Sequence, residues 1–455
     1  MKFTLSSALV VLSAVVSTVL AAPHPASASS VATSTAGNAP AASSAAATNG
    51  TDEAVEQETP STWTVIVDND DPRTLEQMIA DMGDVKVNRI YNNTAFKGFS
   101  CSMASNRASV MSMTGLKTFE RDIEIKVAGS QVNAPWGLQR LSQGQAIQSA
   151  GGLDEAKIAA IDFTYQFEGG LNQTGALGKD VDIYIIDTGI NVDHVDFDGR
   201  ASFGFTIDDE TDSQGHGTHC AGTAASTTFG VAKNANIIAV KVLGPDSGFT
   251  SDILAGIDWM MQNHEKRMKT GNFAGSVASM SLGSLEPSTS LNEAIAQANA
   301  NGIHFSVAAG NEERDACLGS PGSAVVNDAS NAIVVGATTI TDERASFSNF
   351  GDCTTLYAPG QDITSTWVGS TNKINTISGT SMACPHVSGL IAYTLSQNPS
   401  LKTDTKGMKA FLVQSAQDLE ITEPSGDTVT VKYANNGFIA PRTGAKLLKR
   451  TFSRL

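Results

Sequence analysis

Three polar residues that can together form a nucleophilic centre stand at the edges of predicted elements. Asp187 directly follows the apolar run from Val181 to Ile186, which predicts a buried strand. His216 precedes a small-residue helix, and Ser381 follows a flexible glycine at the start of another. A serine oxygen needs a base to take its proton, and the base needs a carboxylate to hold its tautomer. Asp187, His216 and Ser381 supply these three roles.

The order of these residues along the chain separates the classes of serine hydrolase. An α/β-hydrolase needs serine, then an acid, then histidine. The only histidine after Ser381 is His386, and no acid lies between them. The trypsin-like order of histidine, aspartate and serine needs a serine context that this chain lacks. The observed order of aspartate, histidine and serine is that of the subtilisins.

His216 and His219 also have a spacing found in zinc sites. The glutamate that follows the first histidine of the metalloprotease motif is missing here. We therefore interpret His219 as a structural residue one helical turn beyond His216 and expect no metal at this position.

Pro385 fixes where the helix that carries Ser381 begins. A proline at this position cannot donate a hydrogen bond to the carbonyl of residue 381, which is tolerated only in a first turn. The helix then begins beside Ser381 and directs its amide dipoles at any anion that forms there.

Five motifs together resemble the subtilisin family, in particular its fungal branch with proteinase K and cerevisin. They read Asp187-Thr-Gly, His216-Gly-Thr-His-Cys-Ala-Gly, Ser281-Leu-Gly, Ala309-Gly-Asn311 and Gly379-Thr-Ser-Met-Ala. The resemblance implies a serine endopeptidase that acts on protein and peptide substrates through an acyl-enzyme, with broad and mainly apolar specificity. A catalytically silent fold kept for binding is the alternative.

The resemblance also assigns residues around the nucleophile. It implies that the Asn311 side chain and the backbone N–H of Ser381 form an oxyanion hole. Two backbone segments are expected to pair with substrate as extra strands: Ser281, Leu282 and Gly283, and Ser247 and Gly248. The family pattern usually has glycine where this chain has Ser284, which bears on the depth of the specificity pocket.

Five cysteines are present, and Cys101 is expected to leave with the N-terminal segment. The other four allow three fully paired connectivities. The resemblance implies a disulfide between Cys317 and Cys353. Cys220 and Cys384 are interpreted as buried free thiols, with a bridge between them as the alternative.

Calcium is often bound in this branch through an aspartate before Pro359. The corresponding stretch here, residues 353–358, contains no carboxylate. A structural calcium site is therefore not supported, and we expect no cofactor.

The elements that must position these residues follow an alternating pattern. Apolar strands are predicted at 181–186, 237–242, 276–280 and 304–308, and helices at 251–263 and 291–300. This alternation predicts an α/β fold of three layers, in which a parallel sheet is covered by helices on both faces. Sites in such sheets lie at the carboxyl ends of the strands.

The N-terminal third is organised differently. Residues 1–21 read as a signal peptide, and the Ala/Ser/Thr-rich stretch 22–60 as a disordered spacer. Residues 61–127 predict a small ferredoxin-like α+β unit, with strands at 63–67, 98–102 and 123–127 and helices at 74–82 and 104–113. This unit resembles the family's inhibitory prosegment. A flexible, cleavable connection at 128–133 then leads into the peptidase domain, 128–440, and the basic tail, 441–455.

Charge and targeting restrict the partners. With 46 acidic and 30 basic residues, the net charge is −16, which disfavours nucleic acid and anionic membranes as partners. We expect a monomer that is secreted or, alternatively, vacuolar. Asn49, Asn92 and Asn172 each begin a glycosylation motif, and only Asn172 would stay in the mature enzyme.

Overall fold

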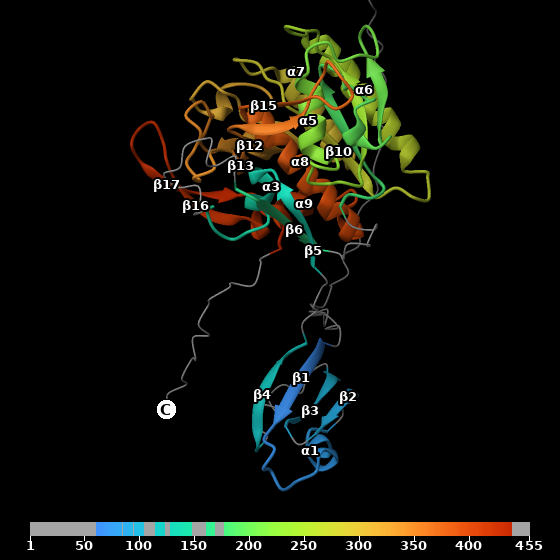
Figure 1. The fold of residues 1–455 in the computed structure, drawn as a ribbon, viewed down its shortest axis with the longest axis vertical. Helices are drawn as coiled ribbons and strands as arrows, with labels where there is room; N and C mark the ends of the chain where they lie inside the picture. Colours follow the sequence, from blue (N-terminus) through green and yellow to red (C-terminus); the bar gives the residue numbers. More distant parts are fainter. Residues whose placement is uncertain are drawn as a thin grey trace, which may run out of the picture. The chain divides into compact units, whose positions relative to one another are not determined.

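The computed structural model describes residues 61–83, 85–93, 95–103, 114–122, 128–147, 161–168 and 177–438 (Figure 1). The chain divides into two compact units, Met1–Asp122 and Ile123–Leu455. The predicted signal peptide, the spacer, the basic tail, the helix at 104–113 and the strand at 123–127 lie outside the described residues. So do the glycosylation motifs at Asn49 and Asn172, whereas Asn92 is exposed at the end of a strand.

The first unit contains a four-stranded antiparallel sheet with the order β2-β3-β1-β4. Its described elements are β1 (Ser61–Val67), α1 (Leu75–Asp81), β2 (Lys86–Asn92), β3 (Lys97–Met103) and β4 (Leu116–Arg121). Alternate residues of β1, namely Trp63, Val65 and Val67, are buried against Leu75 and Met78 of α1. A capping box between Thr74 and Gln77 starts the helix.

The strand that pairs with the outer side of β1 is β4, which the sequence analysis did not predict. Phe119 of β4 stacks on Trp63 with ring centroids 4.7 Å apart. Aromatic pairs of this kind stabilise a specific strand register.

The second unit is built on a nine-stranded sheet with the order β16-β17-β13-β12-β11-β10-β7-β9-β8. Its strands are β7 (Val181–Asp187), β8 (Ala201–Thr206), β9 (Asn236–Lys241), β10 (Gly275–Met280), β11 (His304–Ala308), β12 (Ile333–Thr338), β13 (Leu356–Pro359), β16 (Gln417–Thr422) and β17 (Thr428–Tyr433). All neighbours are parallel except β16 and β17. The predicted α/β class is confirmed.

Helices cover both faces of this sheet. They are α5 (His216–Ala225), α6 (Thr250–Arg267), α7 (Thr289–Ala300), α8 (Thr380–Gln397) and α9 (Thr405–Ser415). Because successive strand residues point to opposite faces, Ile183 and Ile185 of β7 join the core with α5 and α8. Tyr184 and Ile186 join the core with α6 and α7. In the part of the chain that the structure describes, no helix is both long and apolar enough to cross a membrane.

The strand order reverses beside β7. The chain first continues to β8 and β9 on one side, and then returns to β10 and the strands beyond it on the other. A crevice forms where the connections diverge in this way, at the carboxyl ends of the strands. Asp187 ends β7 at this point, and Ser281 directly follows β10.

The predicted flexible connection at 128–133 is instead a strand. Residues Ala128–Ala134 form β5, which pairs antiparallel with β6 (Phe163–Glu168). A short helix, α3 (Trp136–Leu141), follows, and a separate hairpin joins β14 (Ile363–Thr366) to β15 (Ile374–Ile377). The small and polar side chains at 128–133 suggested a loop, but backbone pairing with β6 decides the conformation.

A buried ion pair attaches α3 to the loop between β12 and β13. The Arg140 Nε donates to Asp342 Oδ1 at 2.7 Å, and its second terminal nitrogen donates to Oδ2 at 3.0 Å. The guanidinium also lies 3.9 Å from the ring centroid of Tyr433. Removal of one partner from a buried pair leaves an uncompensated charge.

We therefore expect Asp342→Ala to lower the free energy of unfolding by about 3–5 kcal/mol. The control is Asp418→Ala, which breaks the exposed pair with Lys432 and should cost less than about 1 kcal/mol. Both are measured by urea unfolding in a Ser381→Ala background, which lacks the predicted nucleophile. Equal losses in the two variants would contradict the role of burial.

Candidate active site

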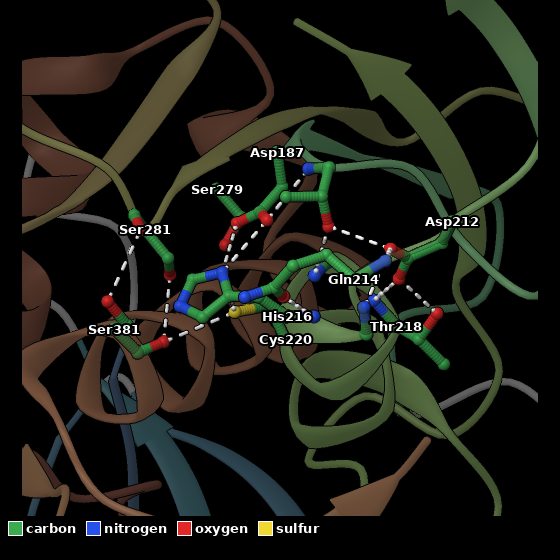
Figure 2. Close-up of polar contacts among 12 residues, drawn as sticks. Asp187, Asp212, Gln214, His216, Thr218, Cys220, Ser279, Ser281 and Ser381 are labelled. Atoms are coloured by element: carbon green, nitrogen blue, oxygen red, sulfur yellow. Dashed lines mark hydrogen bonds and ion pairs between the residues drawn. The ribbon is translucent and has the colours of Figure 1, made fainter. Parts of the chain in front are cut away.

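Asp187 and His216 form a short hydrogen bond at the end of β7. The His216 Nδ1 lies 2.8 Å from Asp187 Oδ1 and 3.0 Å from Oδ2. The Asp187 side chain is fully buried, and its Oδ1 also accepts from the Thr188 backbone N–H at 2.8 Å. A carboxylate on Nδ1 places the proton there and leaves Nε2 as an acceptor. Figure 2 shows the imidazole between Asp187 and Ser381.

Two opposing effects act on the imidazole. Burial lowers the pKa of His216, but the negative charge of Asp187, the neighbouring Cys220 and the hydrogen bonds to both together outweigh burial. The net pKa lies well above its ordinary value of 6.5. His219, one turn further on, is buried without such a partner, and burial lowers its pKa to about 4. Its Nε2 bonds to the Ile363 carbonyl at 2.9 Å. His219 is therefore a neutral residue of the interior.

Two glycines allow His216 to approach Asp187. Gly215 caps α5 at a φ of +106°, and a Cβ there would lie 2.6 Å from the Trp367 ring. A Cβ on Gly217 would lie 2.2 Å from the Gly189 carbonyl oxygen. Larger residues at either position would push the start of α5 away from β7.

A buried carboxylate that the sequence analysis missed holds the same turn. Asp212 Oδ1 accepts from the Thr188 hydroxyl at 2.9 Å and from the backbone N–H of Gln214 and Gly215. Its Oδ2 accepts from the backbone and the hydroxyl of Thr218. Asp212 thus ties the end of β7 to the first turn of α5 (Figure 2). An aspartate three residues before a glycine is a turn signal that could have indicated it.

Ser381 lies in the first turn of α8, half-buried, beside the imidazole. Its Oγ donates to the Ser281 carbonyl at 3.2 Å. Among the hydrogen bonds of the described residues, none joins Ser381 Oγ to His216. Such contacts in unliganded sites are often long and tighten when substrate binds. The structure thus brings together all three residues of the predicted centre.

Asn311 lies on the same pocket wall as Ser381. Its Oδ1 accepts from both the backbone N–H and the hydroxyl of Thr380, at 2.8 and 2.9 Å. These bonds occupy the amide oxygen and fix the orientation of the amide group. Thr380 was not singled out from the sequence, although it precedes Ser381 in a quoted motif.

Asn349 is a second missed residue. Its Oδ1 accepts from the backbone N–H groups of Glu312 and Arg314, both at 3.0 Å. Its Nδ2 donates to the Ala309 carbonyl at 2.9 Å. The buried Asn349 amide therefore binds the backbone on both sides of Asn311.

Both predicted substrate segments line a groove of about 400 Å³ that His216 also lines. The lining includes Ser247 and Gly248 from the first segment and Ser281, Leu282 and Gly283 from the second. A neighbouring pocket of about 180 Å³ lies between residues 281–284 and the Asn311 loop. The Ser284 hydroxyl donates to the Glu286 carbonyl at 2.6 Å, within its own turn.

The four cysteines of the second unit fall into two groups. Cys317 and Cys353 form the disulfide that the resemblance implied. Cys220 and Cys384 are buried and unbridged, in agreement with the interpretation as free thiols. The Cys220 Sγ lies 3.9 Å from His216 Nδ1.

In the described part of the chain, one group of three side chains has the spacing of a metal site: Asp187, His216 and Cys220, with ligand atoms within 4.8 Å of one another. A metal bound there would have to replace the hydrogen bond between Asp187 and His216. The arrangement is therefore better suited to proton transfer.

Comparisons with known proteins agree with this geometry. A profile described as Subtilase family matches residues 178–434. The chain is similar to "Subtilisin-like serine protease Pen ch 18" of Penicillium rubens, with 45% identity over 334 residues, 70% of this chain and 63% of that protein. It is also similar to "Alkaline protease 2" of Aspergillus fumigatus, with 43% identity over 338 residues, 70% of this chain and 64% of that protein.

A solved structure shares the fold. It is a cold adapted subtilisin-like serine proteinase with 37% identity and a TM-score of 0.54, and the match covers 66% of this chain and 98% of the other. The family profile spans more than half of the chain, including β7, α5, β10 and α8, which position the three residues of the predicted centre. The chain therefore belongs to the subtilase family.

Proposed function

We propose that this protein is a serine endopeptidase in which Asp187, His216 and Ser381 act as a catalytic triad. The observation that carries the proposal is the hydrogen bond of 2.8 Å from His216 Nδ1 to buried Asp187, with the imidazole beside Ser381 at the edge of a groove. A catalytically silent binding protein would have no need of this tautomer-fixing bond.

The proposed reaction begins when the Ser381 hydroxyl turns from the Ser281 carbonyl to His216 Nε2. As Ser381 Oγ attacks the substrate carbonyl carbon, its proton passes to Nε2, and Asp187 stabilises the imidazolium. Asn311 and the Ser381 N–H bind the oxyanion. The imidazolium then gives its proton to the leaving amine, and water hydrolyses the ester by the same route.

Substrate is proposed to bind as an extended strand between the two segments that line the groove. The backbone of Ser281, Leu282 and Gly283 fixes its register from one side, and that of Ser247 and Gly248 from the other. The adjoining pocket of about 180 Å³ would receive the side chain before the cleaved bond. The resemblance favours apolar side chains there.

The protein is further proposed to be made as a precursor. Residues 1–21 would direct export, 61–127 would inhibit the groove until removed, and the mature enzyme would be a monomer, secreted or vacuolar. Cleavage near residue 127 would release a chain that starts at β5. Glycosylation at Asn172 would remain on the mature enzyme.

A fluorophosphonate probe tests the proposed activity. We expect covalent labelling of the folded mature protein, because Ser381 Oγ is activated by His216. Labelling should disappear on unfolding and in Ser381→Ala. Absence of labelling on folded protein that lacks the N-terminal unit would refute the enzyme and favour a binding protein.

Turnover should rise with pH, because only neutral imidazole can accept the serine proton. Since the pKa of His216 is raised, the rising limb of kcat/KM should lie above 6.5, with far more turnover at about pH 8 than at about pH 5. Asp187→Asn should move this limb to lower pH and reduce kcat by roughly 10⁴-fold, as in other triads of this type. A profile that is flat between these pH values, or that does not move in Asp187→Asn, would exclude His216 as the base.

Expression of a Ser381→Ala variant tests whether the precursor cleaves itself. Ser381→Ala removes one hydroxyl and little volume, so folding should survive while cleavage does not. In a host without related proteases, this variant should accumulate with the N-terminal unit attached, whereas the parent appears at mature size by intact mass. A Ser381→Ala protein trimmed near residue 128 in that host would show that another enzyme does the processing.

A further inference from the structure

The first turn of α8 contains a carbonyl that its own helix does not satisfy in the usual way. In an α-helix each carbonyl accepts from the N–H four residues later. For Ser381 that residue is Pro385, which has no N–H. A carbonyl left open in a buried turn needs a donor from elsewhere, because an unpaired buried acceptor costs free energy.

Two side chains from other elements supply donors. The Ser281 hydroxyl, directly after β10, donates to the Ser381 carbonyl at 2.8 Å. The Cys220 thiol, on α5, donates to the same oxygen at 3.4 Å. Both side chains are buried, and Figure 2 shows their bonds converging on this carbonyl. The elements that carry the histidine and one substrate segment are thus joined to the residue that carries the nucleophile.

We propose that Ser281 is a positioning residue of the endopeptidase, acting through the Ser381 carbonyl that Pro385 leaves open. This inference rests on the proposed function. Ser381 carries both the attacking oxygen and one oxyanion donor, so a bond that fixes its peptide group fixes both. Small displacements of reacting groups reduce kcat strongly.

The same argument predicts which kinetic constant changes. The backbone of residues 281–283 is the part proposed to pair with substrate, and removing the Ser281 hydroxyl leaves that backbone in place. Ser281→Ala should therefore lower kcat and leave KM nearly unchanged. A defect in substrate binding would raise KM instead.

Ser306 offers a matched control, because its hydroxyl donates to another carbonyl of the same helix. Its buried hydroxyl, on β11, donates to the Cys384 carbonyl at 2.9 Å. The residue four positions after Cys384 is Ser388, which has its own N–H, so that carbonyl does not depend on a side chain. Ser306→Ala removes a comparable hydroxyl and should leave kcat unchanged per active site.

The decisive experiment is a double-mutant cycle between Ser281→Ala and Pro385→Ala. Peptide hydrolysis is measured in mature protein whose active sites are counted with a fluorophosphonate. With proline at 385, Ser281→Ala leaves only the weaker Cys220 thiol as a donor to the Ser381 carbonyl, and kcat should fall at least about tenfold. With alanine at 385, the helix supplies its own donor, and the same change should cost about twofold or less.

An equal loss in both backgrounds, or a loss as large in Ser306→Ala, would overturn the inference. If Pro385→Ala does not fold, Ser281→Thr decides, because its retained hydroxyl should restore kcat whereas a merely structural effect of the position would not be rescued. A parent protein that is not labelled would refute the proposed function itself. A labelled parent with the same kcat as Ser281→Ala would refute only the role of Ser281.

Discussion

The hydrogen bond between buried Asp187 and His216 is the interaction on which the rest of the site depends. A carboxylate without access to water must be paired, because an isolated buried charge is very costly. The pairing requires that the start of α5 lie against the end of β7, which the glycines at 215 and 217 permit. Asp212 then holds that contact from the other side.

The topology of the sheet determines where Asp187 and His216 lie. Because β7 lies where the connections diverge, the ends of β7 and β10 open into one crevice. The helices α5 and α8 share one apolar core beneath the sheet, so the first turns that carry His216 and Ser381 are fixed by the same packing. Side chains from other elements then bind the backbone beside the site: Asn349 donates to the Ala309 carbonyl, and Ser281 donates to the Ser381 carbonyl.

One strand of the first unit, β4, was not predicted, and residues 128–133 were predicted as a flexible connection because their side chains are small or polar. Each of these segments forms a strand because a partner strand is available. β4 pairs with β1, where Phe119 stacks on Trp63, and β5 pairs with β6. Strand formation depends on the neighbour as much as on the segment, so local patterns place it poorly.

The sequence by itself determined the α/β class, the order of the triad residues and the helix start at Ser381, because periodicity, chain order and the restriction on Pro385 are properties of local segments. Only the tertiary structure decided which distant groups complete the site: Asp212, Thr380 and Asn349, and the two donors to the Ser381 carbonyl. Their partners lie on other elements, and the need to satisfy buried polar groups acts only once those elements have packed.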